Sequence, residues 1–227
     1  MYFFILSIAI SPNGNIPVHA FNLISPTFFA NSSTGNKYSL WVNVYGVSER
    51  YLNVYGEKDL RAQMNQFFHR TYTHPVDGTT LDMKMLCNWY WYDETAILET
   101  GKGTKDWNFY RYAETLLSAA EAIAQSSGVN AEAAGYLAQV KARANMEGKD
   151  VSTIASELQR LGKQAFIEEC WKERLREFPL EMKIWDDCVR TGKFPQISAT
   201  NKGEVQFVDL IGAKNGSGAT FKATDLY

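Results

Sequence analysis

The chain has 227 residues, of which 45% are hydrophobic, and its 23 basic and 25 acidic side chains give a formal net charge of −2 at pH 7. A soluble globular chain of this size buries a sizeable core in one large domain or two small ones, and its slightly negative charge argues against nucleic acid as a partner. The three cysteines, Cys87, Cys170 and Cys188, have no metal-ligand spacing, so we expect buried thiols and no disulfide framework.

The first element is an apolar run over residues 1–10. No basic segment opens it, and neither a small-residue cleavage site nor a lipobox cysteine follows it, so the run does not match a signal peptide. It is also too short to span a bilayer. Its β-branched and aromatic residues, ended by the turn sequence Ser11-Pro12-Asn13-Gly14, favour a buried strand. A domain that opens directly on a core strand suggests a chain whose beginning is missing.

Short elements separated by loops are expected in the following stretch. Partial alternation of apolar residues indicates a strand over Tyr38–Tyr45, and Glu57–Phe68 is expected to form a short helix. His69 and His74 lie close in sequence, but no carboxylate or third histidine stands at ligand spacing. We therefore expect no metal site there.

Four consecutive aromatic residues, Trp89-Tyr90-Trp91-Tyr92, lie within residues 81–98. They cannot all face one side of a strand or a helix. One interpretation is a strand that crosses between two packed layers. The other is a surface on which sugar rings stack, because indole and phenol rings combine an apolar face with a polar edge. In this second interpretation, aromatic rings stack on the sugar and nearby polar groups bind its hydroxyls. The candidate glycan-binding residues are Trp41, Trp89, Tyr90, Trp91, Asn43, Asn88 and Asp93.

From Trp107 onward the spacing of apolar residues becomes helical. We predict a helix over Trp107–Ser126, with Tyr110 and the alanines and leucines at helical spacing on its buried face. A second, antiparallel helix is predicted over Ala131–Asn145, with Asn130 as its N-cap. Small residues dominate this pair, which lets the two helix axes approach closely.

A third helix is predicted over Phe166–Phe178, packed against the first two and ended by Pro179, which has no amide donor. Before it, residues 150–162 are expected to form a short helix capped by Asp150 or Ser152. The charged side chains of the third helix are interpreted as paired or solvated, since charged pairs on helices are usually structural.

A further short helix is predicted over Glu181–Arg190, with Ile184, Trp185 and Cys188 on its buried side. We expect Trp185 to be buried near Arg174 or another charged residue of the same corner. Gly192 suits the C-terminal cap of this helix, and Pro195 is expected to block any restart. A short strand is expected at Val205–Val208.

Several of these segments resemble motifs of the SusD/RagB family. The C-terminal signature of that family is matched in order and spacing by Glu173-Arg174, Glu177, Glu181, Trp185, Asp187 and Arg190-Thr191-Gly192-Lys193. Met182 and Ile184 stand where the family usually has Gly and Arg. Three shorter stretches resemble further motifs of the family, namely Asp59-Leu60-Arg61, Arg111-Tyr112-Ala113-Glu114 and Leu137–Ala144. The resemblance covers about Asp59 to Lys193.

The resemblance implies a mainly α fold, with a SusD-like, tetratricopeptide-like helical core, loop-rich insertions and a few short strands. We expect a loop-rich, aromatic ligand-side region over 1–106, a helical core over 107–195 and a C-terminal loop and short strand over 196–227. The motif residues are expected to be structural, namely Arg111, Glu114, Glu173, Arg174, Glu177, Trp185 and Asp187.

The resemblance also implies a function. Members of the family are surface-exposed outer-membrane lipoproteins for nutrient uptake, which bind a glycan or oligosaccharide and deliver it to a SusC-like TonB-dependent transporter. They are not enzymes and need no cofactor. This chain lacks a lipobox, so its membrane association would require a lipid anchor absent from the sequence, and it looks like the C-terminal part of such a protein, truncated at both ends.

Two other classes of function stay open. One is a helical-repeat module that binds a protein segment in its groove. The other is a glycosidase whose carboxylates meet only in the fold. The neighbouring acidic pairs Asp93-Glu94 and Asp186-Asp187 point apart if helical, so neither is a ready catalytic pair.

Overall fold

The computed structural model describes residues 48–76, 78–90, 92, 94, 108–179, 181, 183–216 and 218–226. Its fold is mainly helical with a few short strands, which confirms the predicted fold class. The chain forms two compact units. The helical unit comprises Leu52–Arg61 and Asn108–Tyr227, and the hairpin unit comprises Met1–Tyr51 and Ala62–Trp107. The predicted strand at Tyr38–Tyr45 lies outside the described residues.

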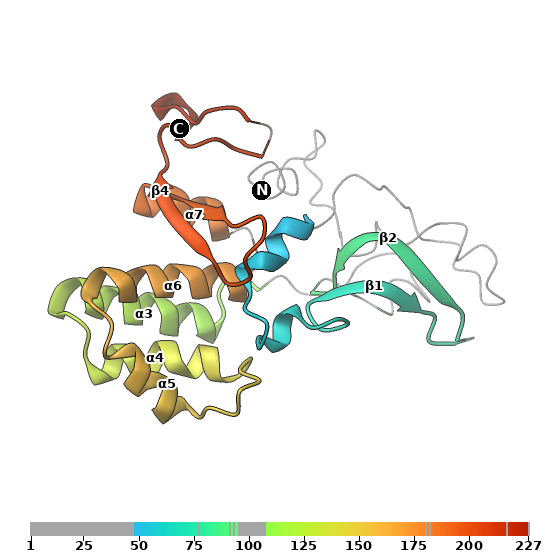
Figure 1. The fold of residues 1–227 in the computed structure, drawn as a ribbon, viewed down its shortest axis with the longest axis horizontal. Coiled ribbons are helices and arrows are strands. Elements are labelled where there is room, and N and C mark those ends of the chain that lie inside the picture. The colour runs from blue at the N-terminus through green and yellow to red at the C-terminus, as the bar shows by residue number, and fades with distance from the viewer. Residues whose placement is uncertain are drawn as a thin grey trace. The chain divides into compact units, whose positions relative to one another are not determined.

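Four helices build the core of the helical unit. They are α3 (Tyr112–Ser127), α4 (Ala131–Ala142), α5 (Val151–Leu158) and α6 (Lys163–Glu177). Helix α3 packs against both α4 and α6, and α5 packs against α4 (Figure 1). Fully buried alanines at the contact of α3 with α4 let the two axes approach closely, and larger side chains such as Leu117, Leu137 and Phe166 fill the remaining core. The predicted three-helix arrangement is confirmed.

Local capping explains where two of these helices begin. The Asn130 side chain accepts a hydrogen bond from the Ala133 amide at 2.9 Å, and the Asp150 side chain accepts one from the Thr153 amide at 2.8 Å. Asn130 was the predicted cap of α4, and Asp150 was one of the two candidates for the cap of α5, with Ser152 as the other. Helix α3, however, begins at Tyr112 and not at the predicted Trp107, because Arg111 has an extended backbone with φ −123° and ψ 153°. Tyr110 therefore precedes the helix, and the prediction that it lies on the buried face is wrong.

Helix α7 (Lys183–Thr191) follows α6 and leads into a two-stranded antiparallel sheet. Its strands are β3 (Lys193–Ile197) and β4 (Val205–Asp209), and the chain ends in the 3₁₀ helix η5 (Ala223–Leu226). Strand β4 was expected, but β3 was not. Pro195 does prevent a helix, yet it pairs with Phe207 inside this two-stranded ladder. A proline is tolerated there because each strand of such a sheet is an edge strand.

The buried side of α7 differs in part from the prediction. Ile184 and Cys188 are buried as expected. Trp185 is only half-buried, and its ring packs on Phe221, with the centroids 5.9 Å apart. The predicted burial of Trp185 is therefore wrong. Its indole lies beside the C-terminal segment, a neighbour that helical periodicity does not reveal.

The described part of the hairpin unit centres on strands β1 (Phe68–Thr73) and β2 (Thr80–Asn88), which pair antiparallel (Figure 1). The 3₁₀ helix η2 (Glu49–Val54) crosses from this unit into the helical unit, and η3 (Leu60–Ala62) crosses back. The helix predicted over Glu57–Phe68 is wrong. Turns, η3 and the first residue of β1 occupy that stretch, because its backbone bonds to distant residues.

Among the residues described above, no helix is both long and apolar enough to cross a bilayer.

Candidate functional site

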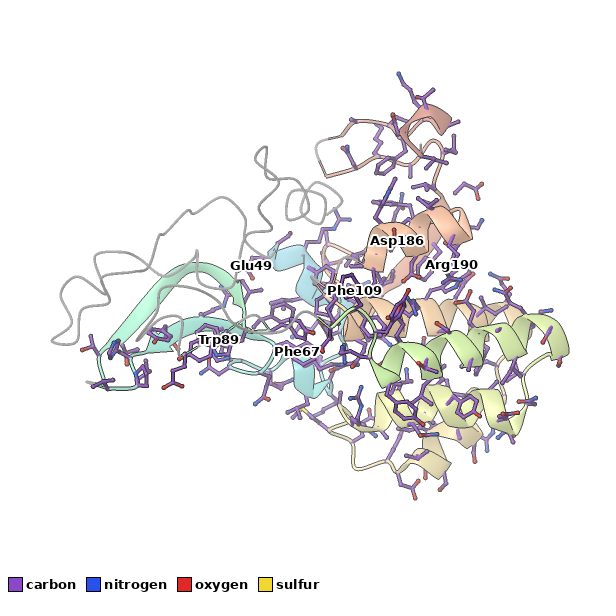
Figure 2. All side chains as sticks on the ribbon, turned by 180° about the vertical axis from the view of Figure 1, so that it is seen from behind. Glu49, Phe67, Trp89, Phe109, Asp186 and Arg190 are labelled. Atoms are coloured by element: carbon purple, nitrogen blue, oxygen red, sulfur yellow. The ribbon has the colours of Figure 1, made fainter. Side chains whose placement is uncertain are left out.

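An aromatic stack follows strand β2 in the hairpin unit, where Figure 2 shows Trp89. The His69 ring stacks on the Trp89 indole with centroids 3.8 Å apart and an interplanar angle of 11°. The Tyr92 ring also stacks on this indole, at 4.7 Å and 13°. Two rings this close to one indole face would overlap, so they lie on opposite faces. Burial lowers the pKa of His69 and raises the pKa of Tyr92, so both rings are neutral in the stack near pH 7.

This geometry bears on the glycan-binding candidates from the sequence. Trp89 already has a ring on each face, so a sugar could reach only its edge. Tyr90 is half-buried in the turn after β2, and Asn88 is the last residue of that strand. The other four candidates lie outside the described residues, namely Trp41, Asn43, Trp91 and Asp93.

Three exposed aromatic residues form a second aromatic surface, at the start of α3 in the helical unit. Phe109 (labelled in Figure 2), Tyr110 and Tyr112 expose 74%, 80% and 72% of their surface. The Lys183 ammonium lies 4.6 Å from the centroid of the Tyr110 ring and also donates a hydrogen bond to the carbonyl of Phe109. Large aromatic residues that are exposed close together in the sequence are typical of an interaction surface. Sequence reasoning missed this surface because helical periodicity assigned Tyr110 to the core.

A buried ion-pair network lies behind this surface and is centred on Glu177 at the end of α6. Its Oε2 accepts a hydrogen bond from Arg61 Nη1 at 3.0 Å, and its Oε1 accepts from Arg111 Nη1 at 2.9 Å and from Arg143 Nη2 at 2.7 Å. Arg111 also donates two hydrogen bonds to Glu181. Burial opposes the charge of Arg111, but Glu181 and Glu177 raise its pKa, so Arg111 is charged at neutral pH.

Glu173, one turn before Glu177, is 1% exposed and accepts hydrogen bonds from Arg61 at 2.8 Å and Arg176 at 3.2 Å. Arg61 also binds Asp59 through two nitrogens, at 2.9 and 2.7 Å. The Asp59-Leu60-Arg61 segment and the α6 motif are therefore two halves of one network. Burial opposes the charge of Glu173, but Arg61 above all keeps its pKa low.

A second group of ion pairs joins α3, α6 and α7. Arg174 donates to Asp187 at 2.7 Å and to Glu114 at 3.4 Å. Arg190, which Figure 2 labels on α7, binds the buried carboxylate of Glu121 through two nitrogens, at 2.7 and 3.0 Å. The signature charges of α6 and α7 thus face the carboxylates of α3. Nothing in this arrangement leaves a carboxylate pair open to a substrate.

The described residues contain no arrangement suited to metal or thiol chemistry. No group of three or more His, Cys, Asp or Glu side chains among them could hold a metal ion. Cys170 and Cys188 are buried free thiols, as predicted. Burial raises the pKa of both, that of Cys188 to about 12, so neither forms a reactive thiolate at neutral pH.

The helical unit also contains a pocket of about 480 Å³. The segment Gly56–Arg61 forms one side of it, and the end of α4 with the connection to α5 forms the other. Buried Glu173 and Arg176 lie at its base. No sequence motif pointed to this pocket, because its two sides are far apart along the chain.

Comparison with known proteins shows which family the chain is related to. Residues 31–220 match the family model described as the SusD family. A solved structure is similar to the chain with a TM-score of 0.72 and 25% identity, namely that of a SusD superfamily protein from Parabacteroides distasonis ATCC 8503. The similarity covers 95% of this chain and 44% of that protein, so the chain spans less than half the length of its solved relative. No curated protein matches the chain.

Proposed function

The chain belongs to the SusD family, and from that premise we propose that it binds a glycan at the cell surface and delivers it to a SusC-like TonB-dependent transporter in the outer membrane. The observation that carries the proposal is the family match over residues 31–220, which supports a SusD-like nutrient-binding protein. The glycan ligand, the partner transporter and the cell-surface location go beyond the family match and are parts of the proposal.

The described surface supports a sugar ligand. Phe109, Tyr110 and Tyr112 present aromatic faces, and the nearby Lys183 ammonium is already paired with Glu114 at 3.1 Å. Exposed aromatic rings beside an ammonium that is already paired suit a neutral hydroxyl-rich chain better than a charged polymer. Tyr90, Trp41 and Trp91 remain candidates for further subsites in the hairpin unit.

Binding is expected to be weak at each contact. An aromatic stacking contact contributes about 0.5–1.5 kcal/mol, so useful affinity requires several subsites. Weak contacts with fast dissociation suit a protein that must release its ligand to a transporter. The protein's part in this scheme is capture and release, and no reaction on the glycan is proposed.

The test is calorimetric titration of the chain with a panel of neutral oligosaccharides, beside alanine variants of the aromatic candidates. The positions are Trp41, Trp89, Tyr90, Trp91, Phe109, Tyr110 and Tyr112. We expect at least one variant to lose oligosaccharide binding while its circular dichroism spectrum stays unchanged. Unchanged binding in every variant, or loss of folding in every variant that loses binding, would refute the aromatic site.

The same preparation separates the other two classes of function. Binding of peptides without any binding of oligosaccharides would favour a helical-repeat interaction module. Release of reducing sugar from the oligosaccharides, abolished by substitution of an acidic residue, would favour a glycosidase.

A further inference from the structure

The pocket of the helical unit has the features of a second ligand site. It lies entirely within the helical unit, between the segment Gly56–Arg61 and the residues from Lys141 to Glu157. Its volume of about 480 Å³ falls in the range of small-molecule sites, roughly 300–1,000 Å³. The backbone holds both sides in place, because the Leu60 amide donates to the Ala144 carbonyl at 2.8 Å and the Met146 amide donates to the Lys58 carbonyl at 2.9 Å.

The charges around the pocket balance one another. Five basic and five acidic side chains line it. Lys149 pairs with Glu147 and Glu157, each at 3.0 Å, and Lys141 pairs with Glu169 behind the wall. A free anion would gain no net attraction here and would meet the lining carboxylates, so the lining favours a neutral ligand.

Arg176 supplies an unused hydrogen-bond donor at the base. The residue is only 8% exposed. Its Nε donates to the Val54 carbonyl at 3.0 Å, and its Nη1 donates to Glu169 at 2.9 Å and Glu173 at 3.2 Å. Its Nη2 has no hydrogen-bond partner among the described residues, and Arg176 lines the pocket. This nitrogen is not among the fully buried side-chain atoms that lack a hydrogen-bond partner, so water can reach it, and a ligand oxygen could take the place of that water.

We infer that this pocket binds one neutral saccharide unit, separately from the exposed aromatic surface. A sugar hydroxyl both donates and accepts hydrogen bonds, and so matches a lining that mixes ammonium and guanidinium donors with carboxylate acceptors. The buried side chains of Ala144 and Ile154 give the pocket an apolar wall for the C–H face of the ring. The choice of a saccharide among neutral polar ligands rests on the proposed function.

The structure offers a variant that fills the pocket without disturbing its ion pairs. Gly56 lines the pocket, and a Cβ added there meets no atom within 4 Å. Gly56→Phe should therefore fold and occupy the site. Gly135→Phe is the matched control, because Gly135 on α4 also has open space for a Cβ and does not line the pocket.

The probes are D-glucose, D-galactose and N-acetyl-D-glucosamine, titrated at millimolar concentration and followed by protein-observed NMR, with D-glucuronate as the anionic comparison. We expect at least one neutral sugar to bind saturably to the unmodified chain and to Gly135→Phe, and to bind at least tenfold more weakly to Gly56→Phe. Circular dichroism confirms that both variants fold.

Three results would overturn the inference: no neutral sugar binds, glucuronate binds more tightly than every neutral sugar, or Gly56→Phe binds as the unmodified chain does. The outcome is separable from that of the proposed function. If oligosaccharides bind and respond only to the aromatic variants, the pocket inference fails and the proposed function stands. If monosaccharides bind and respond to Gly56→Phe while no oligosaccharide binds, the pocket stands and the proposed function fails.

Discussion

Glu177 is a single carboxylate that accepts hydrogen bonds from three arginines. It is buried, and so is Arg61, one of its partners. Both charges have lost their hydration, so each depends on the other to offset that cost. A change at Glu177 therefore acts on every segment that contributes one of these arginines.

We predict that Glu177→Gln lowers the free energy of unfolding by about 3–5 kcal/mol, because it removes one charge from a buried ion-pair network. Urea denaturation followed by circular dichroism measures it. Glu147→Gln is the control, because Glu147 makes an exposed pair with Lys149 that should contribute little to stability. Equal losses for the two variants would show that Glu177 has no central role.

Glu169 predicts a dependence of stability on pH. Burial by itself would raise its pKa, but Lys141 and Arg176 together lower it from 4.5 to about 2. A lowered pKa in the folded state contributes stability that is present above pH 4.5 and is lost as the pH falls toward 2, here about 3 kcal/mol. We expect Glu169→Gln to flatten the fall in unfolding free energy between pH 4.5 and 2. An unchanged acid slope would contradict the assignment.

The sequence revealed contacts between residues that are close along the chain, but not contacts between residues that are far apart along it. Charged side chains on the third helix were expected to be paired or solvated, and Glu173 does pair with Arg176, three residues further on. The same spacing could not reveal Arg61, which binds Glu173 from 112 residues away. In the same way, the sequence marked Trp89 as a candidate stacking surface but could not show that His69 and Tyr92 already cover both of its faces.

Among the elements, those set by local rules were predicted and those set by tertiary bonds were not. Helices α4 and α5 begin at the predicted caps, because a cap is chosen by residues three positions apart. Strand β3 exists only because β4 pairs with it, and the region of η3 is held by the backbone of Ala144. No pattern within β3 or η3 encodes those partners.

Because Trp185 is only half-buried, its contribution to the free energy of unfolding should be smaller than that of a fully buried Trp. Truncation of a fully buried Trp costs roughly 3–5 kcal/mol, whereas we predict about 1–2 kcal/mol for Trp185→Ala, since part of the indole remains in water. Leu137→Ala, in the core between α3 and α4, is the comparison and should cost about 2–5 kcal/mol. Thermal and urea denaturation measure both. Insolubility of Trp185→Ala alone would show that the ring is more important than its exposure implies.

At the scale of the whole molecule, the chain crosses between its two units three times. The segment Leu52–Arg61 belongs to the helical unit, although its neighbours in sequence on both sides belong to the hairpin unit. Side-chain bonds attach it there: the Tyr55 hydroxyl donates to the Arg176 carbonyl at 2.9 Å, and the Asn53 amide donates to the Ser198 carbonyl at 3.0 Å. The segment Leu52–Arg61 is therefore held in place by bonds to residues of the helical unit.

We predict that Arg61→Ala loosens this segment and exposes the bond after Lys58 to trypsin. The Arg61 side chain pairs with Glu173 and Glu177 of α6 and also holds Asp59 within the segment, so its loss removes the ion pairs that Arg61 makes with α6. Limited proteolysis with mass spectrometry should show cleavage after Lys58 at least tenfold faster than in the unmodified chain. Arg160→Ala, an exposed position, is the control and should leave that rate unchanged.

The two arginines that flank residues 62–110 meet at one carboxylate. Arg61 stands immediately before this stretch and binds Glu177 Oε2, and Arg111 stands immediately after it and binds Glu177 Oε1. The chain thus leaves and rejoins the helical frame at a single anchored point, so the stretch between can lengthen, shorten or change its sequence at little entropic cost to the frame. A change of length or sequence in this stretch therefore need not move the helices that hold its two ends.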